Sequence, residues 1–229
     1  MLKRLITLAV LSSTLIYSTD SLSLSFNGNG SSLDIDAEAK LLSAEAQNLS
    51  PEVAKLGLES YNKARAEGLD PQQILTIVDY SQASTTPRLW VFDLKTNTLL
   101  YKELVAHAQN SGDNIPTSFS DDPNSHKSSL GLFVTGDTYD GKHGYSLRLN
   151  GLEKGFNDNA ESREIVVHSA PYVSPEFASS HGRLGRSWGC FALNPTVANA
   201  VISTIKAGTL IFAYAPDQNW LSHSRFLSA

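Results

Sequence analysis

The 229-residue chain has very little cysteine and no cluster of basic residues. Its single thiol, Cys190, has no partner for a disulfide within the chain. The net charge of -5, without a run of lysine or arginine, argues against a nucleic-acid-binding protein. With 41% hydrophobic and 18% charged residues, the composition is that of a globular protein. The length suffices for one domain with a full core and a smaller appendage.

The N-terminus lacks an apolar run long enough to span a bilayer. Lys3 and Arg4 precede an uncharged stretch at 5–17, which falls short of the ~20 residues of a transmembrane helix and fits the h-region of a signal peptide. No Ala-x-Ala site follows, so we weigh cleavage between Ser18 and Ser25 against an uncleaved anchor that keeps the protein at the membrane. Both versions predict an exported protein of the periplasm or cell wall.

Composition divides the chain into five parts. A stretch rich in serine, asparagine and glycine follows the apolar run, and a helical pattern follows that stretch. Ser50 before Pro51 is typical of a helix start. The expected parts are a signal peptide (1–22), a linker (23–36), a helical N-terminal segment (37–70), a main domain (71–216) and a C-terminal tail (217–229).

The main domain is predicted to be mostly β with flanking helices. Short apolar segments, many rich in β-branched residues, are separated by turn signals throughout this region. A helix is expected from Pro195, with Asn194 as its cap and Gly208 at its end. The expected strands are residues 75–80, 89–94, 98–102, 131–135, 145–149, 164–167 and 209–214. This pattern favours a β core with one helix against it.

The candidate chemistry lies between His168 and Cys190. His168 ends an expected strand, and Cys190 follows 22 positions later (190 − 168). A thiol with a pKa of about 8.5 is mostly protonated at neutral pH, so an imidazole is needed either to take its proton or to hold a thiolate–imidazolium pair. Gly189 lets the backbone approach a carbonyl substrate. The amides of Gly189 and Cys190 are candidate donors to the oxyanion that forms on attack.

The motif Ser187-Trp188-Gly189-Cys190 resembles the Ser/Thr-x-Gly-Cys signature of the YkuD-type L,D-transpeptidases, which also have an upstream histidine at a strand end. Several segments resemble the branch described as murein L,D-transpeptidase catalytic-domain-like proteins: 89–93, 128–131, 141–149 and 185–190. The resemblance covers roughly residues 75 to 215. It implies an L,D-transpeptidase-type β-sandwich or barrel core preceded by a short helical segment.

The resemblance also implies a mechanism. Cys190 would attack a stem tetrapeptide of peptidoglycan and form a thioester, with His168 as general base and the Ser169 carbonyl orienting its ring. An amine of a second stem, or water, would resolve the thioester. No cofactor is implied, and the partners are peptidoglycan stem peptides. The open alternatives are an L,D-carboxypeptidase, a hydrolase that releases wall proteins, and a non-enzymatic cell-wall-binding module.

Other residues near the motif are candidates for substrate binding. Ala192 stands where many family members have an arginine, so Arg183 and Arg186 are the candidate carboxylate binders. His181 is the alternative candidate for the general base. It could instead line the donor site, or be a solvated histidine in a loop. The full set of substrate-binding candidates is Arg186, Ser187, Trp188, His181, Arg183 and Tyr145.

No metal site is expected. The spacing of His168, His181 and Cys190 fits no common zinc pattern. The turn Gly141-Lys142-His143-Gly144 is rich in donors but lacks the spacing of a phosphate-binding loop. The sequence leaves the oligomeric state open.

Overall fold

A computed structural model describes residues 32–227 of the chain. The predicted signal peptide and residues 23–31 of the predicted linker lie outside the described residues. Residues 32–36, expected as the end of that linker, belong instead to helix α1, which begins at Ser32. Within the described part, none of the helices has the length and apolar character needed to cross a membrane.

The structure is mostly β, as expected. Within residues 32–227, nine strands form one sheet in the order β3-β2-β1-β9-β5-β6-β7-β8-β4. Most neighbours are antiparallel, but β1 pairs with β9 and β7 pairs with β8 in parallel. The strands are β1 (Ile74–Asp79), β2 (Leu89–Asp93), β3 (Thr98–Glu103), β4 (Val105–Ala106), β5 (Gly131–Gly141), β6 (Gly144–Gly151), β7 (Val166–Ser169), β8 (Phe191–Leu193) and β9 (Leu210–Tyr214).

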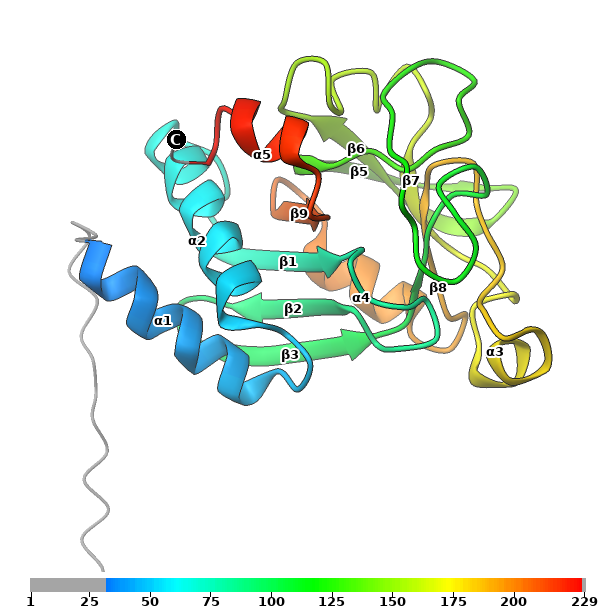
Figure 1. Cartoon of the computed structure of the whole chain (residues 1–229), viewed down its shortest axis with the longest axis horizontal. Helices are drawn as coiled ribbons and strands as arrows, with labels where there is room; N and C mark the ends of the chain where they lie inside the picture. Colours follow the sequence, from blue (N-terminus) through cyan, green and yellow to red (C-terminus); the bar gives the residue numbers. More distant parts are fainter. Residues whose placement is uncertain (1–31, 228–229) are drawn as a thin grey trace, which may run out of the picture. The chain divides into compact units, whose positions relative to one another are not determined.

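Helices cover the sheet and close its core. Helices α1 and α2 pack against each other, α1 contacts β3, and α2 contacts β1 and β9 (Figure 1). Helix α4 contacts β1, β6 and β7. Every position of β1 and β9 is buried, so both faces of the sheet are covered there. The helices are α1 (Ser32–Glu45), α2 (Pro51–Ala66), α3 (Pro175–His181), α4 (Ala198–Ile205) and α5 (Gln218–His223).

Local chemistry accounts for the helix starts. The Ser50 side chain accepts a hydrogen bond from the Val53 amide at 3.2 Å, and Pro51 occupies the first position of α2, as expected. Helix α4 begins at Ala198, three residues after the expected start, because the Asn194 side chain first closes a turn by accepting from the Thr196 amide at 2.9 Å.

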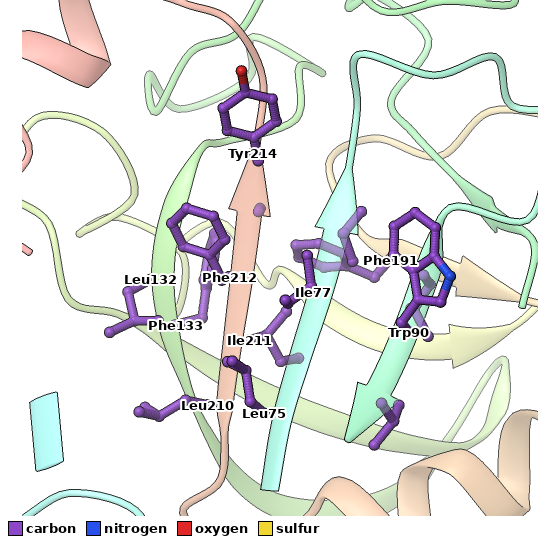
Figure 2. Packing of buried hydrophobic residues seen from close by; sticks show 14 of the residues in the cluster. Leu75, Ile77, Trp90, Leu132, Phe133, Phe191, Leu210, Ile211, Phe212 and Tyr214 are labelled. Atoms are coloured by element: carbon purple, nitrogen blue, oxygen red, sulfur yellow. The ribbon is translucent and has the colours of Figure 1, made fainter. Parts of the chain in front are cut away.

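One large core joins the sheet and the helical segment. Figure 2 shows buried side chains of β1, β2, β5 and β9 gathered together, with Phe191 among them. The Phe191 ring meets Phe133 edge-on at 5.5 Å and stacks with Tyr80 at 6.2 Å between centroids. Because Phe191 follows Cys190 directly, this packing ties the candidate nucleophile to the core.

The C-terminal segment, expected as a tail, packs into the same core. Trp220 of α5 is fully buried, and Phe226 beyond it is also buried. The Trp220 indole N–H donates to Glu153 Oε2 at 3.0 Å. This packing could not be predicted from the sequence, because α5 has only six residues, too few to show the spacing of apolar residues that marks a helix.

Candidate active site

His168 and the segment that carries Cys190 belong to neighbouring parallel strands. His168 lies in β7, and Cys190 directly precedes β8. Val167 pairs with Phe191 in the ladder, and both side chains belong to the core. Side chains alternate along a strand, so His168 lies on the opposite face of β7. Continuing the register by one residue sets Cys190 beside Val166, on the same face as His168.

The His168 ring is buried and held in one orientation. Its Nδ1 lies 2.8 Å from the Ser169 carbonyl oxygen, which only accepts, so Nδ1 carries the proton and Nε2 is left as an acceptor. Burial lowers the pKa of His168, and the nearby His143 and Lys142 lower it further, against the hydrogen bond to Ser169. The imidazole is therefore neutral at pH 7 and able to take a proton at Nε2.

A tight turn presents Cys190. The Ser187 hydroxyl donates to the Cys190 carbonyl at 2.7 Å and accepts from the Gly189 amide at 3.2 Å. Gly189 has φ 137°, and an added Cβ would lie 2.3 Å from Ile165 Cδ1, so only glycine fits. The Gly189 amide, expected as an oxyanion donor, is instead occupied by Ser187.

The Cys190 sulfur faces several polar groups. Its thiol donates to the Glu164 carbonyl oxygen at 3.5 Å. Burial raises the pKa of the Cys190 thiol, while the Val166 amide and the charges of Arg163 and Lys142 act in the opposite direction. As a whole residue, Cys190 is partly buried.

The resting state of the pair follows from these two pKa directions. A raised thiol pKa and a lowered imidazole pKa both favour the neutral forms. Within residues 32–227, no hydrogen bond joins Cys190 to His168. Of the two states left open by the sequence, these pKa directions favour a protonated thiol and a neutral imidazole over a thiolate–imidazolium pair.

Comparison with protein families identifies the domain. The family profile of the L,D-transpeptidase catalytic domain matches residues 45–214, most of the chain. The chain belongs to the L,D-transpeptidase family. A search of curated proteins gives no match.

Solved L,D-transpeptidases resemble the domain at low sequence identity. An L,D-transpeptidase from Mycobacterium smegmatis is 17% identical, with a TM-score of 0.39 over 62% of this chain and 59% of that one. One from Stackebrandtia nassauensis is 12% identical, with a TM-score of 0.39 over 80% of this chain and 77% of that one. The chain thus spans about 59% of the length of the first. The family assignment rests on the profile match.

In this L,D-transpeptidase domain the two candidate carboxylate-binding arginines meet a carboxylate of the protein itself. Arg183 Nε lies 2.8 Å from Asp113 Oδ1, and Arg186 Nη1 lies 3.6 Å from the same oxygen. Arg186 also donates to the Gly112 carbonyl at 3.0 Å. Both guanidinium groups therefore fix the loop around Asp113, whose side chain is 80% exposed.

Trp188 and His181 lie in different surroundings. Trp188, at the tip of the nucleophile turn, is 65% exposed and stacks on the His126 ring at 4.4 Å between centroids. His181 ends α3, stacks on Phe177 at 4.0 Å and contacts the Phe177 carbonyl at 3.0 Å. Trp188 is thus two residues from Cys190 in the chain, whereas these contacts of His181 are all with its own helix α3.

Tyr145 lies on the other face of the sheet from His168. Leu147 pairs with Val167, so Tyr145, two residues away in β6, shares the core face. A hydrogen bond with Thr138 lowers the pKa of its phenol. The structure therefore does not bring Tyr145 to the Cys190 side, where the sequence suggested a role in a cleft.

His143 is a site residue that the sequence analysis left without a role. Its ring stacks on the His168 ring at 4.3 Å between centroids and 25° between planes. It occupies the two-residue turn between β5 and β6, and its carbonyl lies 3.4 Å from the Ser169 hydroxyl. The glycines at 141 and 144 mark this turn in the sequence, but nothing there shows which strand it approaches.

No metal centre is formed by the described part of the chain. Within residues 32–227, no three or more histidine, cysteine, aspartate or glutamate side chains are grouped so as to hold a metal ion.

Proposed function

We propose that the domain is an exported peptidoglycan L,D-transpeptidase in which Cys190 is the nucleophile and His168 the general base. The observation that supports this is that His168 lies in β7 while Cys190 directly precedes β8, the parallel neighbour of β7, with the Ser169 carbonyl fixing the tautomer of His168. Strands ~4.8 Å apart with a rise of ~3.3 Å per residue put the two Cα atoms roughly 8 Å apart, a separation that a histidine and a cysteine on one face span.

The first half-reaction is acyl transfer to sulfur. The substrate is a stem tetrapeptide, and the Cys190 sulfur attacks the carbonyl of its third residue while His168 Nε2 takes the thiol proton. The C–N bond to the terminal D-alanine then breaks, and His168 returns the proton to the leaving amine. A thioester on Cys190 results, and the base is again neutral.

The second half-reaction decides the product. Attack by the side-chain amine of a second stem gives a cross-link, and attack by water gives a trimmed tripeptide. The signal-peptide pattern at 1–22, outside the described residues, supports action outside the cytoplasm.

Intact-mass analysis after exposure to a tetrapeptide donor tests the proposal. The wild type should gain the mass of the tripeptide acyl group with loss of D-alanine, and Cys190→Ala should gain nothing. A wild-type protein that binds muropeptides without gaining mass would instead identify a wall-binding module. Dimers among the products identify a transferase, and trimmed stems alone identify a hydrolase.

Paired histidine variants identify the base. His168→Gln should slow acylation by roughly 10²- to 10⁴-fold, the usual contribution of a general base. His181→Gln is the matched change on α3 and should leave the rate near that of the wild type. The reverse result would transfer the role to His181.

A further inference from the structure

A pocket opens beside the nucleophile. It has a volume of about 270 Å³, and Trp188, His126, Arg163 and Glu164 are among its lining residues. The pocket is connected to Cys190 in two ways, once through the chain and once through a hydrogen bond. Trp188 precedes Cys190 by two positions in the nucleophile turn, and the Glu164 carbonyl accepts the thiol hydrogen bond. Cys190 does not itself line the pocket, so the pocket adjoins the sulfur through Glu164 and Trp188.

One wall of the pocket is aromatic and preformed. The Trp188 and His126 rings are nearly parallel, with 10° between their planes. The Asn110 amide donates to the His126 carbonyl at 3.1 Å, and Gln109 Nε2 lies 3.3 Å from His126 Nδ1. An exposed indole face held in this way attracts a cation through the ring quadrupole.

The unpaired charge of the pocket is negative. The Arg163 guanidinium is used internally, with bonds to Ser129 Oγ at 2.6 Å and the Lys127 carbonyl at 2.7 Å, and its side chain is only 4% exposed. It also pairs with Asp121 at 3.4 Å. The Glu164 side chain is exposed, and its carboxylate has no hydrogen bond or ion pair within residues 32–227.

The pocket backbone is held in an uncommon conformation. Asn124 (φ 60°), His126 (φ 50°) and Glu164 (φ 55°) all occupy the left-handed region. Such residues persist where the surrounding structure fixes them, and they gather at binding and catalytic sites. The pocket is thus built into the fold by three separate backbone constraints.

We propose that this pocket binds the acyl acceptor as a primary ammonium, between the Trp188 face and the Glu164 carboxylate. The inference rests on the proposed function and specifies its second substrate. The acceptor loses one proton to solvent, its nitrogen attacks the thioester carbonyl, and the C–S bond breaks. A second proton moves from nitrogen to the Cys190 sulfur, so an amide, a thiol and one released proton balance the step.

The test measures how a preformed acyl-enzyme divides between transfer and hydrolysis. The donor is a stem tetrapeptide, and the acceptor is a stem tripeptide with a free side-chain amine. Products are normalised to the acyl-enzyme that the same variant forms. Glu164→Gln should raise the acceptor concentration needed for half-maximal transfer by roughly two- to fivefold, the scale of an exposed ion pair. Trp188→Leu should act in the same direction.

Glu161→Gln is the matched control. Glu161 is also exposed, lies three positions earlier, and does not line the pocket, so its transfer should equal that of the wild type. The pocket assignment alone is overturned if Glu164→Gln and Trp188→Leu both form normal amounts of acyl-enzyme and both divide it between transfer and hydrolysis as the wild type does. Absence of acyl-enzyme in the wild type overturns the proposed function and the inference with it.

Discussion

At the scale of single residues, the chemistry depends on two opposite pKa shifts. Burial raises the pKa of the Cys190 thiol and lowers that of the His168 imidazole. Both shifts favour the neutral groups, so in the proposed mechanism proton transfer accompanies the attack on the carbonyl. A protonated thiol is also less easily oxidised than a thiolate, which would suit a lone cysteine if the protein is exported as we propose.

The rate of alkylation by iodoacetamide should reveal this state. Only thiolate reacts, and a raised thiol pKa keeps its fraction small at pH 7, so the rate should climb about tenfold per pH unit from pH 6 to pH 8. His168→Gln should show the same slope. A rate that is already level below pH 7 in the wild type, and lost in His168→Gln, would contradict the neutral pair.

The sequence was sufficient to nominate the base and the nucleophile but not all of their surroundings. His168 and Cys190 stand out because their residue types and strand positions suit one reaction. Tyr145 shows the limit, because a role in a cleft depends on which face of the sheet its side chain occupies. The pairing of Leu147 with Val167 decides that face, and the sequence does not reveal the pairing. The occupied Gly189 amide likewise depends on a contact with Ser187 that spacing does not reveal.

At the scale of elements, the β5–β6 hairpin completes the site. Its turn sets His143 against His168 and brings the charge of Lys142 near both His168 and Cys190. Positive charge favours neutral imidazole and ionised thiolate, so Lys142 lowers both pKa values. One exposed turn thus lowers the pKa values of His168 and Cys190 together.

Replacing Lys142 by glutamine should therefore shift the pH profile of kcat/KM to higher pH on both limbs. Without the charge, His168 holds its proton to a higher pH, and the Cys190 thiol ionises at a higher pH. The plateau rate should change little, because at the plateau both His168 and Cys190 are already in their reactive protonation states. Lys154→Gln, an exposed lysine on the loop after β6, is the control and should leave both limbs in place. If both limbs of the kcat/KM profile stay in place in Lys142→Gln, the charge of Lys142 does not influence the two pKa values.

The approximate positions of most strands and helices could be predicted from the periodicity of apolar residues, but where each one begins and ends depends on single residues. Strand β7 was expected from residue 164 but begins at Val166, because Glu164 adopts a left-handed conformation that no strand residue has. Helix α3 and strand β4 were not foreseen, since each is too short for its apolar period to be visible. The order of strands in the sheet depends on tertiary packing, which no local pattern encodes.

At the scale of the whole molecule, residues near both ends of the described part stabilise the catalytic sheet. Helices α1 and α2 and the C-terminal Trp220 all belong to the large core cluster. Trp220 packs against Phe212 and Tyr214 of β9, the strand that lies between β1 and β5. The segment at 217–227 is therefore part of the domain.

Trp220→Ala should destabilise the domain by about 3–5 kcal/mol, the usual cost of removing a buried aromatic side chain. It also leaves the buried Glu153 carboxylate without its indole donor. Urea and thermal unfolding followed by circular dichroism measure the loss. Asn219→Ala, an exposed change in the same helix, should leave the unfolding midpoint nearly unchanged. Equal midpoints for the two variants would mean that α5 is dispensable.

The parallel pairing of β7 and β8 has a consequence for how such proteins diversify. Two adjoining strands that run the same way require a crossover, and here that excursion carries α3 and the paired arginines. The pairing of β7 with β8, and not the length of the excursion, sets the separation between His168 and Cys190. Insertions or deletions between positions 173 and 183 would therefore change the excursion while the pairing of β7 with β8, and the placement of His168 relative to Cys190, is kept.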